Sequence, residues 1–188
     1  MSAKLVYIAN VSLDGYTEDA DGRFDFTEPS DEVFVCITDL IRPVETYLYG
    51  RRMYETMAVW ETTPELAADS ELRADFANVW QAADKVVYST ALREPSTART
   101  RIESGFSADA VRDLKTSAAS DLTIGGPTIA AHALRAGLID ECHLFVASVA
   151  VGGGKPAFPP DVRVQFELLD ERRFASGTLH LRYRVERP

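Results

Sequence analysis

Signatures of metal and thiol chemistry are scarce in this sequence. It has two cysteines, Cys36 and Cys142, each alone in an apolar stretch, and three histidines without metal-ligand spacing. It also lacks the H-x-E and P-C-x-x-C motifs of zinc-dependent nucleobase deaminases. We therefore expect two buried, reduced thiols and structural histidines, and nothing in the sequence implies a metal or a flavin.

Long apolar runs and an excess of positive charge are also missing. No apolar segment approaches the roughly 18 residues of a membrane-spanning helix, and the run over residues 5–9 is too short for a signal peptide. We expect a cytoplasmic protein with no membrane partner. The 29 acidic residues outnumber the 20 basic ones, which gives a net charge of −9 and opposes binding to nucleic acid. An anionic ligand would need a local cluster of arginines or backbone amides.

The sequence does contain enough apolar residues for one core. A chain of 188 residues with 46% hydrophobic content predicts a single domain over residues 1–188. Short apolar runs predict buried strands over residues 4–10, 46–49, 85–89, 122–124 and 142–149. Helical spacing of apolar residues predicts helices over residues 31–41, 53–60, 70–83, 108–116 and 128–136, the first with Ser30 as its capping hydroxyl. This alternation indicates an α/β protein with a mostly parallel sheet.

The pattern changes near the C-terminus. Leu179, Leu181, Tyr183 and Val185 alternate with polar residues, which is typical of a strand with one solvated face. An antiparallel hairpin with residues 164–169 would close the sheet. We therefore expect a mixed, mostly parallel central sheet flanked by helices.

Three strand-to-helix junctions offer groups that bind phosphate. Gly125, Gly126, Pro127 and Thr128 place free amides at a helix start, Gly50 precedes the guanidiniums of Arg51 and Arg52, and Ser89 and Thr90 supply hydroxyls. Each alone is also a common turn or solvated helix start. Ligands collect at the carboxyl ends of strands in α/β sheets, so the three together favour a dinucleotide.

Two common nucleotide motifs are excluded. The Rossmann fingerprint G-x-G-x-x-G is absent, so a nicotinamide cofactor would be held in another way. The segment Gly152-Gly153-Gly154-Lys155 is not a P-loop, because Pro156 follows the lysine where Ser or Thr is required.

The ordered motifs resemble the dihydrofolate-reductase superfamily. The resemblance is carried by Ser12-Leu13-Asp14-Gly15, Gly50-Arg51-Arg52-Met53-Tyr54-Glu55, Ser89, Ile124-Gly125-Gly126-Pro127, Gly137-Leu138-Ile139-Asp140-Glu141 and Val151-Gly152-Gly153-Gly154-Lys155-Pro156-Ala157-Phe158. Within that superfamily the chain is most similar to the C-terminal reductase domain of bifunctional riboflavin-pathway deaminase-reductases, the RibD C-terminal domain. The resemblance covers nearly the whole chain and implies a three-layer, dihydrofolate-reductase-like fold.

The resemblance also implies a function and a cofactor. It implies an NADPH-dependent transfer of a hydride to a small heterocyclic substrate, such as 5-amino-6-(5-phosphoribosylamino)uracil or a dihydrofolate-like compound. Gly50, Arg51, Arg52, Ser89 and Thr90 would lie near the adenosine 2′-phosphate, and Ile124, Gly125, Gly126, Pro127 and Thr128 near the pyrophosphate. Ala9, Asp14 and Gly15 would line the nicotinamide. The sequence departs from the pattern at Met53, Phe145 and Ser148, and Phe145 disfavours folate as the substrate.

A reductase usually needs an acid that delivers a proton next to the carbon that accepts the hydride. Asp31 and Glu32, in the first turn of the predicted helix over residues 31–41, are the candidates, although acids also favour helix starts for electrostatic reasons. Two alternatives remain open: a dinucleotide-binding protein without turnover, and a dimeric scaffold with a vestigial cleft. Relatives in this branch tend to pair through their sheets, which implies a homodimer that involves the predicted strand over residues 142–149.

Overall fold

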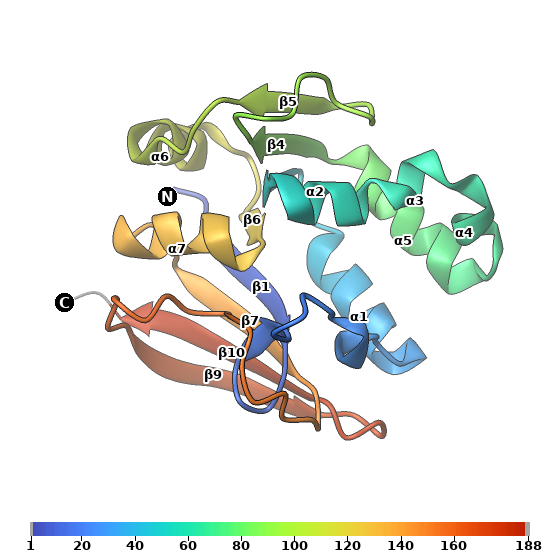
Figure 1. Cartoon of the computed structure of the whole chain (residues 1–188). Coiled ribbons are helices and arrows are strands. Elements are labelled where there is room, and N and C mark those ends of the chain that lie inside the picture. The colour runs from blue at the N-terminus through green and yellow to red at the C-terminus, as the bar shows by residue number, and fades with distance from the viewer. Residues whose placement is uncertain (1, 187–188) are drawn as a thin grey trace.

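A computed structural model describes residues 2–186 of the chain. Its centre is an eight-stranded sheet with the strand order β5-β4-β3-β6-β1-β7-β10-β9, which runs from top to bottom in Figure 1. The strands are β1 (Leu5–Val11), β3 (Thr46–Gly50), β4 (Asp84–Tyr88), β5 (Thr100–Glu103), β6 (Leu122–Gly125), β7 (Glu141–Val146), β9 (Gln165–Arg173) and β10 (Leu179–Glu186). The first six run parallel, whereas β10 is antiparallel to both β7 and β9. The predicted mixed sheet and its C-terminal hairpin are therefore confirmed.

Helices cover both faces of the sheet, which gives three layers (Figure 1). They are α1 (Asp31–Ile41), α2 (Arg51–Met57), α3 (Val59–Thr62), α4 (Pro64–Ala68), α5 (Glu71–Ala82), α6 (Ala108–Ser117) and α7 (Pro127–Arg135), with a short 3-10 helix at Asp25–Thr27. Successive side chains of a strand point to opposite faces. Tyr47 and Tyr49 accordingly pack with Trp80 of α5, and Leu48 packs with Ile129 of α7. No helix within residues 2–186 is long and apolar enough to cross a membrane.

Some segments differ from the sequence prediction. β2 (Tyr16–Glu18), β5 and β8 (Lys155–Pro156) lie in segments where no strand was predicted, because they are short and lack a continuous apolar run. The helix predicted over residues 53–60 is interrupted at Ala58, between α2 and α3. The predicted strand over residues 142–149 ends at Val146.

Two local predictions on side chains were wrong. Ser30 is the N-cap residue of α1, but its hydroxyl makes no capping hydrogen bond and is buried without a partner among residues 2–186. Cys142 is fully buried as expected, whereas Cys36 on α1 is only partly buried because it lies at the margin of a small cluster around Phe145 and Phe174. Both cysteines are free thiols.

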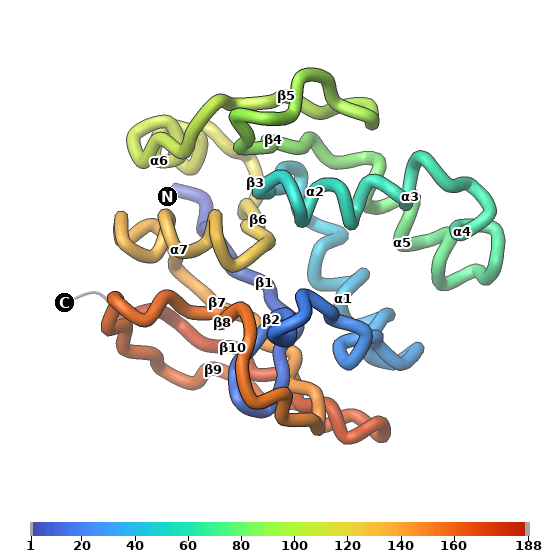
Figure 2. Tube along the Cα trace, in the orientation of Figure 1, coloured from blue at the N-terminus to red at the C-terminus, as the bar shows by residue number. Residues whose placement is uncertain are grey.

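A second, two-stranded sheet connects two loops that are far apart in the sequence. β2 pairs with β8, and Figure 2 shows these two segments side by side in front of β1. A Cβ at Gly154 would overlap the carbonyl oxygen of Glu18, so only glycine permits this close backbone contact. The β1–β2 loop and the segment over residues 151–156 therefore form one packed unit.

Candidate functional site at the strand ends

The register of the sheet brings the predicted phosphate-binding junctions together. Tyr49 of β3 lies opposite Gly125 of β6, and Gly50 lies opposite Tyr88 of β4. These strands are parallel and neighbouring, so the starts of α2 and α7 and the turn at Ser89 share one edge of the sheet. Sequence reasoning anticipated this grouping, because carboxyl ends of parallel strands meet at the same edge.

The glycines at the β6–α7 junction pack against side chains of β3 and α2. A Cβ at Gly125 would lie 2.9 Å from Cε1 of Tyr49, and one at Gly126 would lie 3.2 Å from Cβ of Met53. Gly126 also has a φ of +97°, a left-handed conformation that favours glycine. Both glycines thus have a structural role, and they leave the first amides of α7 open beside the exposed Thr128.

The two arginines at the start of α2 each form an ion pair with an acidic residue of this chain. Arg51 bonds Glu55 one turn along the helix at 3.0 Å, and Arg52 bonds Glu18 of β2 at 3.0 Å. About half of each arginine side chain remains exposed, and exposed ion pairs of this type contribute only about 0–1 kcal/mol. A phosphate group can therefore compete for both guanidiniums.

The hydroxyls after β4 are arranged differently from each other. Ser89 Oγ accepts hydrogen bonds from the amides of Ala91 and Leu92, at 3.1 and 2.9 Å, and so stabilises a turn. Its own proton remains available to a ligand. Thr90 is exposed.

The predicted nicotinamide-lining residues lie on β1 and the loop that follows it. Ala9 is buried in the main core, and Gly15 has a φ of +87° in a tight turn. The carboxylate of Asp14 accepts hydrogen bonds from Ser12 Oγ (2.7 Å) and from the amides of Val151 (3.1 Å) and Gly152 (2.7 Å). These bonds, the one from Ser12 above all, lower the pKa of Asp14 to about 2. Asp14 therefore anchors the glycine-rich segment as an ionised carboxylate.

A groove of about 550 Å³ lies between the start of α1 and the end of β7. Three segments line it: Phe26, Glu28, Pro29 and Ser30 before α1, Ala147, Ser148 and Val149 after β7, and Ser176 and Thr178 in the β9–β10 turn. A small cavity of about 20 Å³ continues from it toward Asn10 and Phe145. The amino-acid sequence does not reveal this groove, since the lining residues come from three separate segments and carry no common motif.

The candidate acids Asp31 and Glu32 are both exposed in the first turn of α1. Glu32 accepts a hydrogen bond from the amide of Ala175 at 3.3 Å, which connects α1 to the β9–β10 turn. Neither residue is among those that line the groove. Glu28 does line it, and it is the one carboxylate among the described lining residues.

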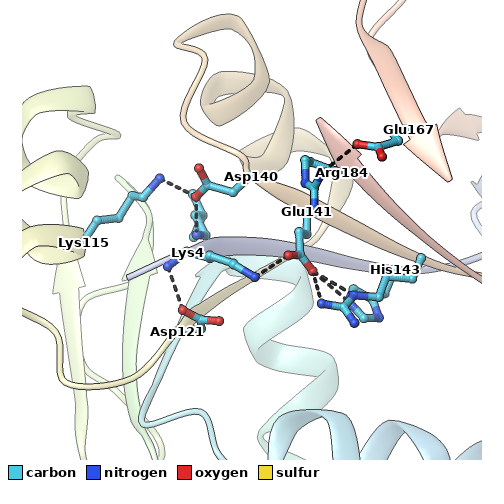
Figure 3. A network of polar contacts seen from close by, with 10 residues as sticks. Lys4, Lys115, Asp121, Asp140, Glu141, His143, Glu167 and Arg184 are labelled. Atoms are coloured by element: carbon cyan, nitrogen blue, oxygen red, sulfur yellow. Dashed lines mark hydrogen bonds and ion pairs between the residues drawn. The ribbon is translucent and has the colours of Figure 1, made fainter. Parts of the chain in front are cut away.

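Charged residues form a separate network where β1, β7 and β10 lie side by side (Figure 3). Glu141 accepts from Lys4 Nζ at 2.5 Å and from Arg182 Nε at 2.9 Å. Burial opposes ionisation of Glu141, but these bonds outweigh burial and its pKa lies below the usual value. Nearby, Lys115 bonds Asp140 and the carbonyl of Leu138, which fixes the turn before β7.

Two histidines, treated separately in the sequence analysis, form a buried pair next to this network. His143 Nδ1 lies 2.9 Å from His180 Nε2, and the His180 ring stacks on Phe145 with centroids 4.4 Å apart. Burial, with smaller effects of His180 and Arg182, lowers the pKa of His143 to about 4, and burial also lowers the pKa of His180. The prediction that His180 occupies a solvated strand face was wrong, because the side chains of β7 cover it.

The sheet is mostly parallel, and the carboxyl ends of its strands converge beside a groove. This is the arrangement of ligand sites in α/β enzymes. Comparison with known families agrees. The family model described as RibD C-terminal domain matches residues 3–180, and the chain belongs to this family. The resemblance to the dihydrofolate-reductase superfamily and its riboflavin-pathway branch is thereby confirmed.

Individual relatives are distant. The protein YyaP of Bacillus subtilis (strain 168), described as uncharacterized, is 26% identical over 176 residues, which are 92% of this chain and 90% of that protein. A putative riboflavin biosynthesis protein from Shewanella sp. PV-4 has a similar structure, with a TM-score of 0.76, 20% identity and full coverage of both chains. A deaminase and 5-amino-6-(5-phosphoribosylamino)uracil reductase from Thermotoga maritima matches with a TM-score of 0.64 and 14% identity, over 98% of this chain and 57% of that one. The family and the fold support a reductase of the riboflavin-pathway type.

Proposed function

We propose that the chain is an NADPH-dependent reductase that transfers a hydride to a small heterocyclic substrate of the type reduced in riboflavin biosynthesis. The observation that carries this proposal is the pairing of Tyr49 with Gly125, which sets the arginines of α2 beside the free amides of α7. One junction supplies guanidiniums and the other supplies backbone donors, which are the two kinds of group that hold phosphates. Family membership supports a reductase independently of this geometry.

The donor groups fit a phosphorylated dinucleotide. We assign the 2′-phosphate to Gly50, Arg51, Arg52, Ser89 and Thr90, and the pyrophosphate to Ile124, Gly125, Gly126, Pro127 and Thr128. Release of Arg52 from Glu18 would cost little, since that arginine is 59% exposed. The net charge of −9 makes these local cations necessary for any anionic ligand.

When bound, NADPH supplies the hydride, and the residues of this chain position the ring and the substrate. We place the nicotinamide beside Ala9, Asp14 and Gly15, where Asp14 holds the glycine-rich segment in place. The substrate would occupy the groove next to the start of α1. Asp31 and Glu32 stay our sequence-based candidates for the proton donor, and Glu28 is a third candidate because it lines the groove.

Equilibrium titration with NADPH and NADH tests the cofactor assignment directly. We expect NADPH to quench protein fluorescence and to raise the melting temperature, with tighter binding than NADH. Oxidation of NADPH in the presence of aminouracil or pterin-like substrates tests turnover. Failure of NADPH to bind would overturn the proposal, and binding without oxidation across the substrate panel would favour the alternative of a dinucleotide-binding protein without turnover.

We further propose that residues 1–188 act as one cytoplasmic reductase domain and form a homodimer through the late strands of the sheet. The exposed apolar side chains of Leu168 on β9 and Leu179 on β10 support a contact between the late strands of two copies. Light scattering during size-exclusion chromatography gives the mass in solution. A monomer at micromolar concentration would contradict the dimer without affecting the cofactor assignment.

A further inference from the structure

We infer that the groove beside α1 takes an unphosphorylated heterocycle that carries amino or other hydrogen-bond donor groups. The inference rests on the proposed function, since it names the substrate class of that same site. The Thermotoga maritima relative is described as a reductase of a phosphoribosylated aminouracil. The groove in this chain has the wrong chemistry for such a phosphate.

The first reason is the absence of cations. Of the described residues that line the groove or the small cavity behind it, none is a lysine or an arginine. Phosphate recognition normally uses guanidinium, ammonium or a cluster of free amides. The hydroxyls on the far wall do not compensate, because Ser148 donates to the carbonyl of Gly177 at 2.8 Å and Ser176 bonds Thr178 at 3.2 Å.

The second reason is the negative charge at the near wall. Glu28 is exposed to the groove, and its carboxylate makes no hydrogen bond or ion pair within residues 2–186. The start of α1 would by itself attract an anion, but Asp31 and Glu32 occupy its first turn and offset that partial charge. A phosphate dianion here would meet the carboxylate of Glu28, with Asp31 and Glu32 in the adjoining helix turn, and no lysine or arginine among the described lining residues.

Free polar groups at the groove instead suit a neutral ring with donors. Besides the carboxylate of Glu28, the side-chain amide of Asn10 at the small cavity behind the groove makes no hydrogen bond within the described residues. A polar group without a partner is costly when it is desolvated, so a ligand that satisfies it gains affinity. Phe26, Pro29 and Val149 supply apolar surface for a flat ring. Amino groups on that ring would donate to Glu28.

The test is a comparison of two compounds that differ only in the phosphate: 5-amino-6-(5-phosphoribosylamino)uracil and its dephosphorylated form. Their dissociation constants are measured by calorimetry with the whole protein, both alone and saturated with NADP⁺. We expect the dephosphorylated compound to bind at least tenfold more tightly. Equal affinity, preference for the phosphate, or binding of neither compound would overturn the inference. NADPH binding is measured separately, so a failure of the cofactor proposal is distinguished from a failure of this one.

Variants of the groove make the test specific. Ser176→Lys places an ammonium at the rim and should improve binding of the phosphorylated compound about tenfold, whereas Ser176→Gln should not. Glu28→Gln should reduce the discrimination between the two compounds several-fold. Glu65→Gln, the same charge change at an exposed position on α4, should leave it unchanged. A ratio of affinities that is unaffected by both groove variants would contradict the assignment of the substrate to this groove.

Discussion

The ring of Tyr49 occupies the position into which a side chain at Gly125 would extend. The two residues face each other in the β3–β6 pair, and a Cβ at Gly125 would lie 2.9 Å from Cε1 and 3.2 Å from Cδ1 of the tyrosine. Tyr49 cannot move away easily, since it is 6% exposed and accepts a hydrogen bond from Trp80 Nε1 at 3.3 Å. The candidate pyrophosphate turn is therefore fixed directly to the core between the sheet and α5.

This contact predicts the effect of a single methyl group. Gly125→Ala should lower the free energy of unfolding by about 1–3 kcal/mol, the usual cost of overpacking a core. Urea unfolding measures it. Gly105→Ala is the matched control, because a Cβ at Gly105 meets nothing within 4 Å. Equal stability of the two variants would show that Tyr49 does not constrain the turn.

The assignment of Arg52 predicts a difference between the two nicotinamide cofactors. Arg52→Gln should weaken NADPH binding about tenfold, or roughly 1.4 kcal/mol, while NADH binding changes less than twofold. Only NADPH carries the 2′-phosphate that Arg52 would contact. Arg73→Gln is a suitable control, since Arg73 is also a partly exposed arginine and forms an ion pair with Asp69. A parallel loss of NADH affinity would assign Arg52 to another part of the cofactor.

The buried histidine pair predicts acid sensitivity. The pKa of His143 is lowered to about 4 in the folded protein, from about 6.5 when unfolded, so the unfolded state takes up the proton first as the pH falls. The stabilisation is fully present above pH 6.5 and is lost as the pH falls toward 4. For His143 alone, the loss between pH 7.5 and pH 5 is on the order of 2 kcal/mol.

Urea unfolding at several pH values tests this prediction. In His143→Asn the stability should fall less steeply with acid than in the wild-type protein, even if the variant is less stable at pH 7.5. His132→Asn should retain the wild-type slope, because His132 lies on α7 and contacts Phe106, away from this pair. An unchanged slope in His143→Asn would mean that His143 does not dominate the acid response.

The hydrogen bonds of Asp14 predict local order in the glycine-rich segment. Asp14→Ala should accelerate hydrogen exchange at the amides of Val151 and Gly152, because both donate to this carboxylate. Asp21→Ala, which removes an exposed aspartate from the loop after β2, should leave exchange at those two amides unchanged. NMR or mass spectrometry measures the rates.

The sequence was sufficient to predict the sheet and its converging strand ends. Buried parallel strands have continuous apolar runs, and the glycines after β6 mark the junction clearly, so local patterns carry this information. The alternation from Leu179 to Val185 likewise indicated a C-terminal strand, although it did not show that the His180 side chain is covered. The short strands β2 and β8 were missed because their pairing depends on a contact across more than 130 residues.

The groove and the histidine pair could not be predicted for a different physical reason. Glu28, Ser148 and Thr178 lie on three separate segments. The register of β7 with β10 brings the segments of Ser148 and Thr178 together, and Glu28 reaches them from the segment before α1. His143 and His180 likewise become neighbours only through that register. Asp31 and Glu32 have a pattern that helix electrostatics alone explains, so the sequence gives no way to separate a catalytic acid from a helix-start acid.

The contact between Gly154 and the backbone of Glu18 has a consequence for how such proteins can be recombined. A loop exchange between this chain and a relative such as YyaP that replaced only the β1–β2 connection would bring a foreign backbone against the resident glycine segment. Function should survive only in chimaeras that transfer residues 12–22 and 151–156 together. These two stretches therefore behave as a single structural module, although most of the chain separates them.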